Sequence, residues 1–144
     1  VIAIDYKTAN LQEVIPELCP EGIDVIFDNV GGEFLNTSLL SINQNARVAI
    51  CGAISGYNNE APAPGPSNYT ALLIQRAKME GFIVLDYMDR FPEAIGELMQ
   101  WVQEGKIIYQ EDIQEGIENA PETLLRLYTG QNKGKQLLKI ADPE

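Results

Sequence analysis

Two short segments combine polar side chains with glycine at points where buried strands are predicted to end. The first is DNVGG at residues 28–32, and the second is CGAIS at residues 51–55. In the first segment, Asn29 could present its amide to a ligand while glycine lets that ligand approach the backbone. Asn and Gly are also usual turn residues, so either segment alone indicates only a turn. Because neighbouring parallel strands deliver their ends to one crevice, the two segments together favour a binding site.

Further side chains that could do chemistry lie close to these segments or near the end of the chain. Tyr57, within SGYNN at 55–59, could donate a proton or a hydrogen bond to a substrate carbonyl; otherwise it is a half-buried loop aromatic. Cys51 is expected to be a small core residue, because no base that would activate its thiol is in view. The segment TGQNKGK at 129–135 is either a solvated turn or a loop that closes over a ligand.

The composition excludes several kinds of active site. The chain has no histidine, which rules out a Ser-His-Asp triad, a Cys-His pair and a His-built metal site within it. Its two cysteines, Cys19 and Cys51, are too few for a structural zinc site. The net charge of −11 argues against a nucleic-acid partner. No apolar run approaches the roughly 20 residues of a membrane span, so a cytoplasmic protein without a membrane partner is expected.

Hydrophobic patterns predict the elements that would position these residues. Strands are predicted at 1–5, 23–29, 47–55, 82–87 and 135–140. Helices are predicted within 8–18, 33–43, 69–76, 91–102 and 119–130. This alternation indicates an α/β fold with a doubly wound parallel sheet and right-handed crossovers. The run at 23–29 is apolar on both faces, which is typical of a sheet covered by helices on both sides.

Capping residues and helix breakers predict how some of these elements begin and end. Asn10 with Glu13 resembles a capping box. Pro16 lies inside the same predicted helix, where proline costs on the order of 3 kcal/mol, so that helix is expected to be short or kinked. Asn119 and Gly130 predict the two caps of the last helix. A proline-rich loop at 56–69 is long for a compact domain, and such loops are more often functional than idle.

The glycine-rich phosphate loop of a dinucleotide-binding fold is absent from the sequence. A Rossmann site opens with G-x-G-x-x-G between its first strand and its first helix. In this chain no two glycines are separated by a single residue. The chain is therefore not expected to hold a pyrophosphate in the usual way.

Four segments resemble, in order and spacing, the C-terminal part of zinc-independent medium-chain dehydrogenase/reductases. They are DNVGGEFLN at 28–36, RVAICGAISGYN at 47–58, MEGFIVLDY at 79–87 and NKGKQLLKI at 132–140. The resembling branch contains prostaglandin reductases, leukotriene hydroxydehydrogenases and bacterial NADP-dependent enone reductases, whose members are well over twice this length. The resemblance implies that residues 1–105 are part of a Rossmann-like NAD(P)-binding domain that lacks its first strands. Residues 106–144 would be a C-terminal segment that returns to the catalytic domain.

The resemblance also implies an activity, a cofactor and a set of contacts. The activity is hydride transfer from NADPH to the β-carbon of an α,β-unsaturated ketone or aldehyde without a metal. By position, the cofactor contacts would be Tyr6, Asn29, Cys51, Gly52, Ala53, Ile54, Ser55, Tyr57, Phe82, Ile83, Val84 and Asn132. Tyr57 would also lie near the substrate and is the candidate catalytic residue. Two subunits would join their sheets through an edge strand at 82–87 to form a homodimer.

Two other interpretations remain open at this point. The chain could be a module that serves only folding or dimerisation and binds no cofactor. It could instead belong to a quinone oxidoreductase-type relative, with a quinone as its small-molecule substrate. On any of these interpretations, the missing glycine-rich loop predicts that the chain by itself has little or no activity. An unpaired inner strand at 23–29 would also favour association.

Overall fold

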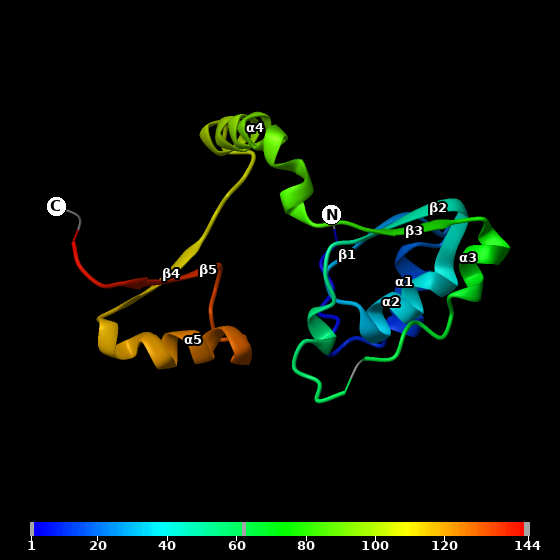
Figure 1. The fold of residues 1–144 in the computed structure, drawn as a ribbon, viewed down its shortest axis with the longest axis horizontal. Coiled ribbons are helices and arrows are strands. Elements are labelled where there is room, and N and C mark those ends of the chain that lie inside the picture. The colour runs from blue at the N-terminus through cyan, green and yellow to red at the C-terminus, as the bar shows by residue number, and fades with distance from the viewer. Residues whose placement is uncertain (1, 62, 143–144) are drawn as a thin grey trace. The chain divides into compact units, whose positions relative to one another are not determined.

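A computed structural model describes residues 2–61 and 63–142 and divides the chain into two compact units. The first unit is Val1–Met88 and the second is Asp89–Glu144. Both units are built from strands and helices in alternation, which confirms the predicted α/β class (Figure 1). In the described part of the chain, no helix is long and apolar enough to span a bilayer. The expected division after residue 105 stays a prediction about how a longer parent protein is organised.

The first unit is built on a three-stranded parallel sheet in the order β1-β2-β3. The strands are β1 (Ile23–Asp28), β2 (Ile42–Ile50) and β3 (Lys78–Gly81). The helices are α1 (Leu11–Leu18), α2 (Gly32–Ser38) and α3 (Thr70–Gln75), with 3-10 turns at Leu39–Ser41, Ile54–Gly56 and Val84–Arg90. Parallel pairing through helical crossovers places the ends of β1 and β2 at one edge of the sheet, as the sequence predicts.

Helices of the first unit cover only one face of this sheet. Residues from β1, β2, α2 and the 3-10 turn after it form the buried core, namely Ile26, Leu35, Leu39, Ile42, Ala46 and Val48. Helix α3 packs against the same cluster through Ala71 and Leu72. On the opposite face of β1, Val25 is 68% exposed and Phe27 is 59% exposed. The helical cover predicted for this second face is therefore absent from the described residues of the unit.

The first helices form where the sequence predicts them, with local differences. Asn10 caps α1 by accepting a hydrogen bond from the Gln12 N–H at 3.2 Å, without forming the expected box with Glu13. With Pro16 inside it, α1 has eight residues and is short, as predicted. The helix expected over 33–43 ends at Ser38, because Ile42 instead pairs with Ile23 as the first residue of β2.

Two predicted strands are not formed. Residues 2–5 contain no strand, since no described strand lies beside them to pair with, and position 1 lies outside the described residues. The strand predicted at 82–87 is wrong as well: β3 ends at Gly81, and 3-10 turns begin at Val84. Asp86 closes this turn by donating its N–H to the Ile83 carbonyl at 3.1 Å and accepting the Ile83 N–H at 3.3 Å.

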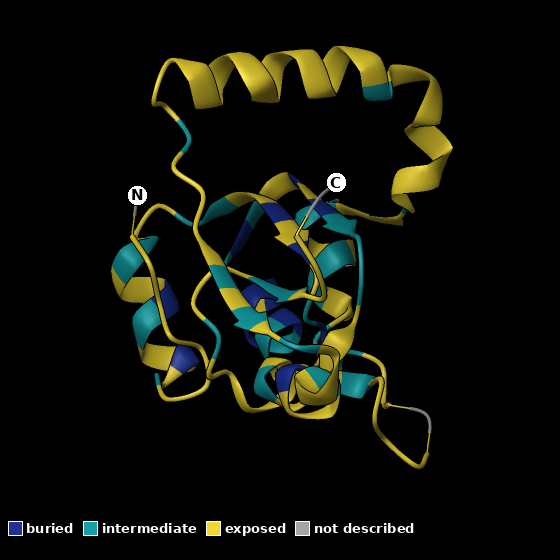
Figure 2. Cartoon of the chain, turned by 90° about the vertical axis from the view of Figure 1, so that its left-hand side faces the viewer, coloured by how far each residue is buried: buried dark blue, intermediate teal, exposed yellow. Residues whose placement is uncertain are grey.

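The second unit contains a long helix and a small parallel sheet. Its elements are α4 (Phe91–Gln103), β4 (Glu111–Glu115), a 3-10 turn at Ile117–Asn119, α5 (Ala120–Thr129) and β5 (Lys135–Lys139). Strands β4 and β5 pair in parallel, and the predicted helices and closing strand are confirmed. Almost the whole of α4 is exposed (Figure 2). Gly130 caps α5 as predicted, but Asn119 donates its side-chain amide to the Glu115 carbonyl instead of capping the helix.

Candidate functional site

The carboxyl ends of β1 and β2 are tied together by Asp28, which is fully buried. Its carboxylate accepts the N–H groups of Val30 at 2.8 Å and Gly31 at 3.0 Å. Its carbonyl oxygen accepts those of Cys51 at 2.8 Å and Gly52 at 3.2 Å. Sequence analysis missed this residue and stressed its neighbour Asn29. The sequence feature that could have indicated it is an acidic residue at the end of an apolar strand, directly before a glycine turn. A carboxylate buried there needs hydrogen-bond donors, and the backbone N–H groups of the turn supply them.

The two polar segments then run side by side, as the sequence predicts. The Asn29 carbonyl accepts the Ile54 N–H at 3.1 Å, and the Val30 carbonyl accepts the Ser55 N–H at 3.0 Å. Gly32 has a φ of +56°, and a Cβ built on it would lie 2.8 Å from Ser55 Oγ. The left-handed backbone therefore favours glycine here, and a side chain at this position would also displace the Ser55 hydroxyl.

Tyr57 is held with its hydroxyl at the end of β2. The Ala53 N–H donates to Tyr57 Oη at 3.2 Å, while the residue as a whole is 68% exposed. A Cβ added to Gly52 would lie 3.1 Å from the same oxygen. Because the hydroxyl accepts from the backbone, its own hydrogen is free to be donated to a ligand. The expectation of a half-buried loop aromatic is not met.

A shallow pocket of about 540 Å³, widely open to solvent, lies beside this hydroxyl, across the ends of β2 and β3. It is lined by Ile50, Cys51, Gly52, Ala53, Tyr57, Gly81, Phe82, Ile83 and Asp86. Six of these residues belong to the predicted contact set, although they come from two separate segments of the sequence. Asp86 is an addition that the sequence did not indicate, and it brings a carboxylate to the rim. Apolar walls with a few fixed polar groups are typical of sites for small organic ligands.

Two further pockets continue along the same edge of the sheet, and Gly31 and Ser55 line both of them. One, of about 330 Å³, contains the predicted residue Tyr6, whose ring lies 6.5 Å from that of Phe34. The other, of about 550 Å³, lies beneath the proline-rich loop. The structure thus places Tyr6, Ser55 and the 540 Å³ pocket along one edge, which suits an elongated ligand better than a compact one.

The proline-rich loop is fastened to α2 by Asn36. Its side-chain oxygen accepts the Ser67 hydroxyl at 3.0 Å and the Asn68 N–H at 3.2 Å. Its carbonyl accepts the Asn68 side-chain amide at 2.9 Å. The end of this loop, at Ser67 and Asn68, is therefore held against the helix that follows the first polar segment.

The remaining predicted residues do not line the 540 Å³ pocket. Asn29, Ile54 and Val84 are exposed, and Val84 lies within the 3-10 turn that replaces the predicted strand. Asn132 belongs to the second unit, where it lies in the turn between α5 and β5 and donates its side-chain amide to the Gly134 carbonyl at 2.9 Å.

Comparison with known proteins decides the family. The family model described as zinc-binding dehydrogenase matches residues 2–104. The chain belongs to this family of medium-chain dehydrogenase/reductases. The family's description names zinc, but among the described residues no three His, Cys, Asp or Glu side chains gather where they could hold a metal ion. The described residues of this chain therefore offer no ligand set for zinc.

Individual relatives are similar over nearly all of the chain. It is 42% identical to prostaglandin reductase 1 of Bos taurus, covering 96% of this chain and 43% of that protein. It is 37% identical to the NADPH-dependent curcumin reductase of Escherichia coli, covering 97% of this chain and 42% of that protein. The structure of CurA from Vibrio vulnificus in complex with NADPH matches with a TM-score of 0.82 at 37% identity, over 97% of this chain and 43% of CurA. The chain thus spans less than half the length of these relatives.

Proposed function

We propose that this chain is the C-terminal portion of an NADP-dependent oxidoreductase that reduces the C=C bond of α,β-unsaturated ketones or aldehydes. The observation that carries the proposal is the 540 Å³ pocket, in which Cys51–Ala53, Tyr57 and Phe82–Ile83 meet at the ends of two parallel strands. Relatives named as prostaglandin reductase and NADPH-dependent curcumin reductase support the same reaction class. We place the enzyme in the cytoplasm, and residues 106–144 in its catalytic domain.

The edge of the sheet fits a nicotinamide dinucleotide. The bound cofactor would supply a hydride, and the residues of this chain would bind and orient it. Cys51 and Gly52 line the 540 Å³ pocket, while Tyr6 and Ser55 line the 330 Å³ pocket farther along the same edge. Asn29 would contact the cofactor at the end of β1. Ile54 would line the nicotinamide and ribose, and Val84 would border the nicotinamide pocket through its backbone. Asn132 would also contact the cofactor.

Tyr57 would act on the substrate carbonyl. Its Oη is fixed by the Ala53 N–H, so its own hydrogen can be donated to the carbonyl oxygen. Such a hydrogen bond draws electrons from the conjugated double bond and makes the β-carbon a better hydride acceptor. A donor that is already positioned stabilises the charge that develops on oxygen during transfer.

The homodimer belongs to the same proposal, with a change in its detail. Residues 82–87 form turns in this chain, yet Ile83, Val84 and Leu85 are each more than half exposed beyond the free edge of β3. Exposed apolar residues beside an unpaired strand support burial by a second subunit. Sedimentation velocity over a range of protein concentrations tests the proposed homodimer. A protein that stays monomeric at every concentration contradicts it.

The quinone alternative gains nothing from the solved structures. A quinone oxidoreductase of Pseudomonas syringae matches with a TM-score of 0.72 at 20% identity, which shows a shared fold alone. The competing function is a folding or dimerisation module that binds no cofactor. A measurement of NADPH binding decides between this module and the proposed oxidoreductase.

The test is an NADPH fluorescence titration, followed by enone reduction, on two proteins. For the complete enzyme that carries this sequence we expect saturable binding and turnover. For the isolated chain we expect neither, because the glycine-rich loop is absent. Turnover by the isolated chain at rates typical of enzymes, on the order of 1 to 1000 per second, would contradict the second expectation. A complete protein that neither binds NADPH nor reduces an enone would overturn the proposed function.

A further inference from the structure

The second unit contains one ion pair that differs from the others in its burial. Arg126 Nη2 lies 2.7 Å from Asp112 Oδ2, and the two side chains are only 24% and 16% exposed. Every other ion pair between described residues has a partner that is more than 60% exposed. Because withdrawing charges from water is costly, a shielded pair is weak evidence for stability and raises the question of what it positions.

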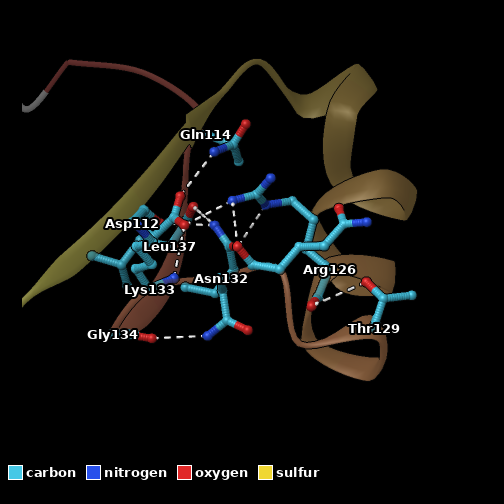
Figure 3. Close-up of polar contacts among 10 residues, drawn as sticks. Asp112, Gln114, Arg126, Thr129, Asn132, Lys133, Gly134 and Leu137 are labelled. Carbon is cyan, nitrogen blue, oxygen red and sulfur yellow. Dashed lines mark hydrogen bonds and ion pairs between the residues drawn. The ribbon is translucent and has the colours of Figure 1, made fainter.

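The same carboxylate fixes the turn between α5 and β5 (Figure 3). Asp112 Oδ2 also accepts the backbone N–H of Lys133 at 3.0 Å, and Oδ1 accepts the Gln114 side-chain amide at 2.9 Å. Lys133 directly follows Asn132, the residue proposed above to contact the cofactor. One carboxylate on β4 therefore holds both α5, through Arg126, and the backbone of this turn.

A third side chain closes the arrangement into a ring. Arg126 Nε donates to Gln136 Oε1 at 3.0 Å, and Gln136 Nε2 donates to the Asp112 carbonyl at 2.7 Å. The guanidinium thus contacts β4 and β5 at once, which requires its planar fork and is beyond the reach of a lysine ammonium.

The ends of the turn are also fixed by the backbone. The Gln131 N–H donates to the Arg126 carbonyl at 3.0 Å, and the Lys135 N–H donates to the Gln110 carbonyl at 2.8 Å. Gly134 has a φ of +83°, and an added Cβ would collide with the Gln110 carbonyl oxygen. This surface turn is held at both ends and in its middle, more tightly than a mere connection requires.

We propose that Asp112 and Arg126 are positioning residues, which hold the turn at 131–134 in the shape that presents Asn132 to the dinucleotide. The inference rests on the proposed function, because it assumes the contact of Asn132 with the cofactor. With the turn ordered in advance, binding does not have to order it, so affinity is gained without a new contact.

The ionisation state of Asp112 suits this role. The Lys133 N–H, followed by Gln114 and Arg126, holds the pKa of Asp112 below its usual range, although partial burial opposes the shift. The groups that face the carboxylate are Arg126 from α5, the Lys133 N–H from the turn and the Gln114 amide from β4, while the Gln136 amide from β5 donates to the backbone carbonyl of Asp112. The carboxylate is therefore charged at neutral pH, when its hydrogen bonds are strongest.

The experiment compares Asp112→Asn and Arg126→Lys with Glu104→Gln as the matched control. Glu104 is an exposed acid that also binds a cation and an amide, Lys106 and Gln100, but it lies at the end of α4 outside the ring. Amide exchange of Lys133 is measured on the chain itself. The KM for NADPH, kcat and the thermal midpoint are measured on the complete enzyme. The KM is the discriminating readout, since a purely structural role would lower only the midpoint.

In Asp112→Asn we expect exchange of the Lys133 amide to become on the order of tenfold faster. We expect the KM for NADPH to rise about tenfold, with kcat at saturation within about twofold of the wild type, because binding and not chemistry is affected. Arg126→Lys should act in the same direction, and it carries the test if the first variant does not fold. Glu104→Gln should change none of these values.

A variant with a faster Lys133 amide and an unchanged KM for NADPH overturns the inference and leaves the proposed function standing. An unchanged amide also overturns it, because Asp112 then does not hold the turn. If the wild-type enzyme fails to bind NADPH, the proposed function fails and the inference with it, and this is seen before any variant is made.

Discussion

At the scale of single residues, the site depends on the buried carboxylate of Asp28 and on the hydrogen-bonded hydroxyl of Tyr57. Asp28 uses its carboxylate on two N–H groups of the glycine turn and its carbonyl on two more from the neighbouring strand end. Tyr57 depends on that second strand end, because Ala53 supplies the N–H that fixes its hydroxyl. The residue proposed to face the ligand is thus held by a strand end that Asp28 fixes in place.

Asp28→Ala should destabilise the first unit strongly. The substitution leaves the N–H groups of Val30 and Gly31 without their acceptor, at a cost of about 1–3 kcal/mol in the free energy of unfolding. Urea denaturation followed by circular dichroism measures this. Asp24→Ala is the matched control on the same strand, because Asp24 is exposed and bonds only to the Asn43 amide in the described structure. Equal effects of the two substitutions would show that the buried carboxylate has no special role.

Gly52→Ala should reduce enone turnover in the complete enzyme with little change in stability. The new Cβ would lie 3.1 Å from Tyr57 Oη, so the hydroxyl must move away from the Ala53 N–H. Displacing a catalytic group by a fraction of an ångström should lower kcat by about tenfold or more. Gly96→Ala, where nothing lies within 4 Å, serves as the control. An unchanged kcat in Gly52→Ala would rule out a catalytic role for this hydroxyl.

At the scale of elements, hydrogen bonds across the chain overrule local preference. The segment FIVLDY is rich in residues that favour strands, yet β3 ends at Gly81. A strand needs a partner on at least one side, and beyond the Phe82 N–H, which donates to Ile50, the chain turns through Asp86. The proline-rich loop shows the converse, because its described residues form no regular strand or long helix and the loop is still held to α2 by Asn36.

Asn36→Ala should release the proline-rich loop from α2. The change removes the acceptor used by Ser67 and the Asn68 N–H, and exposed loops without such anchors are preferred sites of proteolysis. Cleavage within residues 57–68 during limited proteolysis should become several-fold faster. This is the factor expected when hydrogen bonds with a net contribution of about 1 kcal/mol no longer hold the loop closed. Asn59→Ala changes the same loop without touching the clamp. Identical cleavage rates in both variants would contradict the clamp.

At the scale of the whole molecule, charge and exposed apolar surface oppose each other. The net charge of −11 favours separation of the chains, whereas Val25, Phe27 and the apolar residues of α4 favour association. Acidification neutralises most of this charge and removes repulsion. It also protonates carboxylates such as Asp112, whose hydrogen bonds hold the second unit together. Acidification should therefore favour association of the chains while it destabilises the second unit.

Asp112 should make the second unit sensitive to acid. Its pKa is lowered in the folded chain by the Lys133 N–H and then by Gln114 and Arg126, so its stabilising contribution is complete above the usual aspartate pKa of about 3.9. That contribution is lost as the pH falls through the lowered folded value. The thermal midpoint of Asp112→Asn should therefore lie below that of the wild type at pH 7 and converge with it at the lowest pH. A difference that stays constant with pH would contradict this.

The sequence by itself determined the order of most elements, the meeting of residues 28–32 with 51–55, and the family. The order of the elements follows from local patterns, because apolar periodicity, glycine and proline act on their own neighbours. The meeting of the two segments follows from the rule that parallel strands end at one edge of a sheet, and the family follows from the resemblance of four segments. Only the tertiary structure decided that 82–87 turns, that one face of the sheet is exposed, that Asp28 joins the strand ends and that Arg126 joins β4 to β5. Each of these depends on partners distant in sequence, and a hydrogen bond between such partners leaves no periodic trace in the chain.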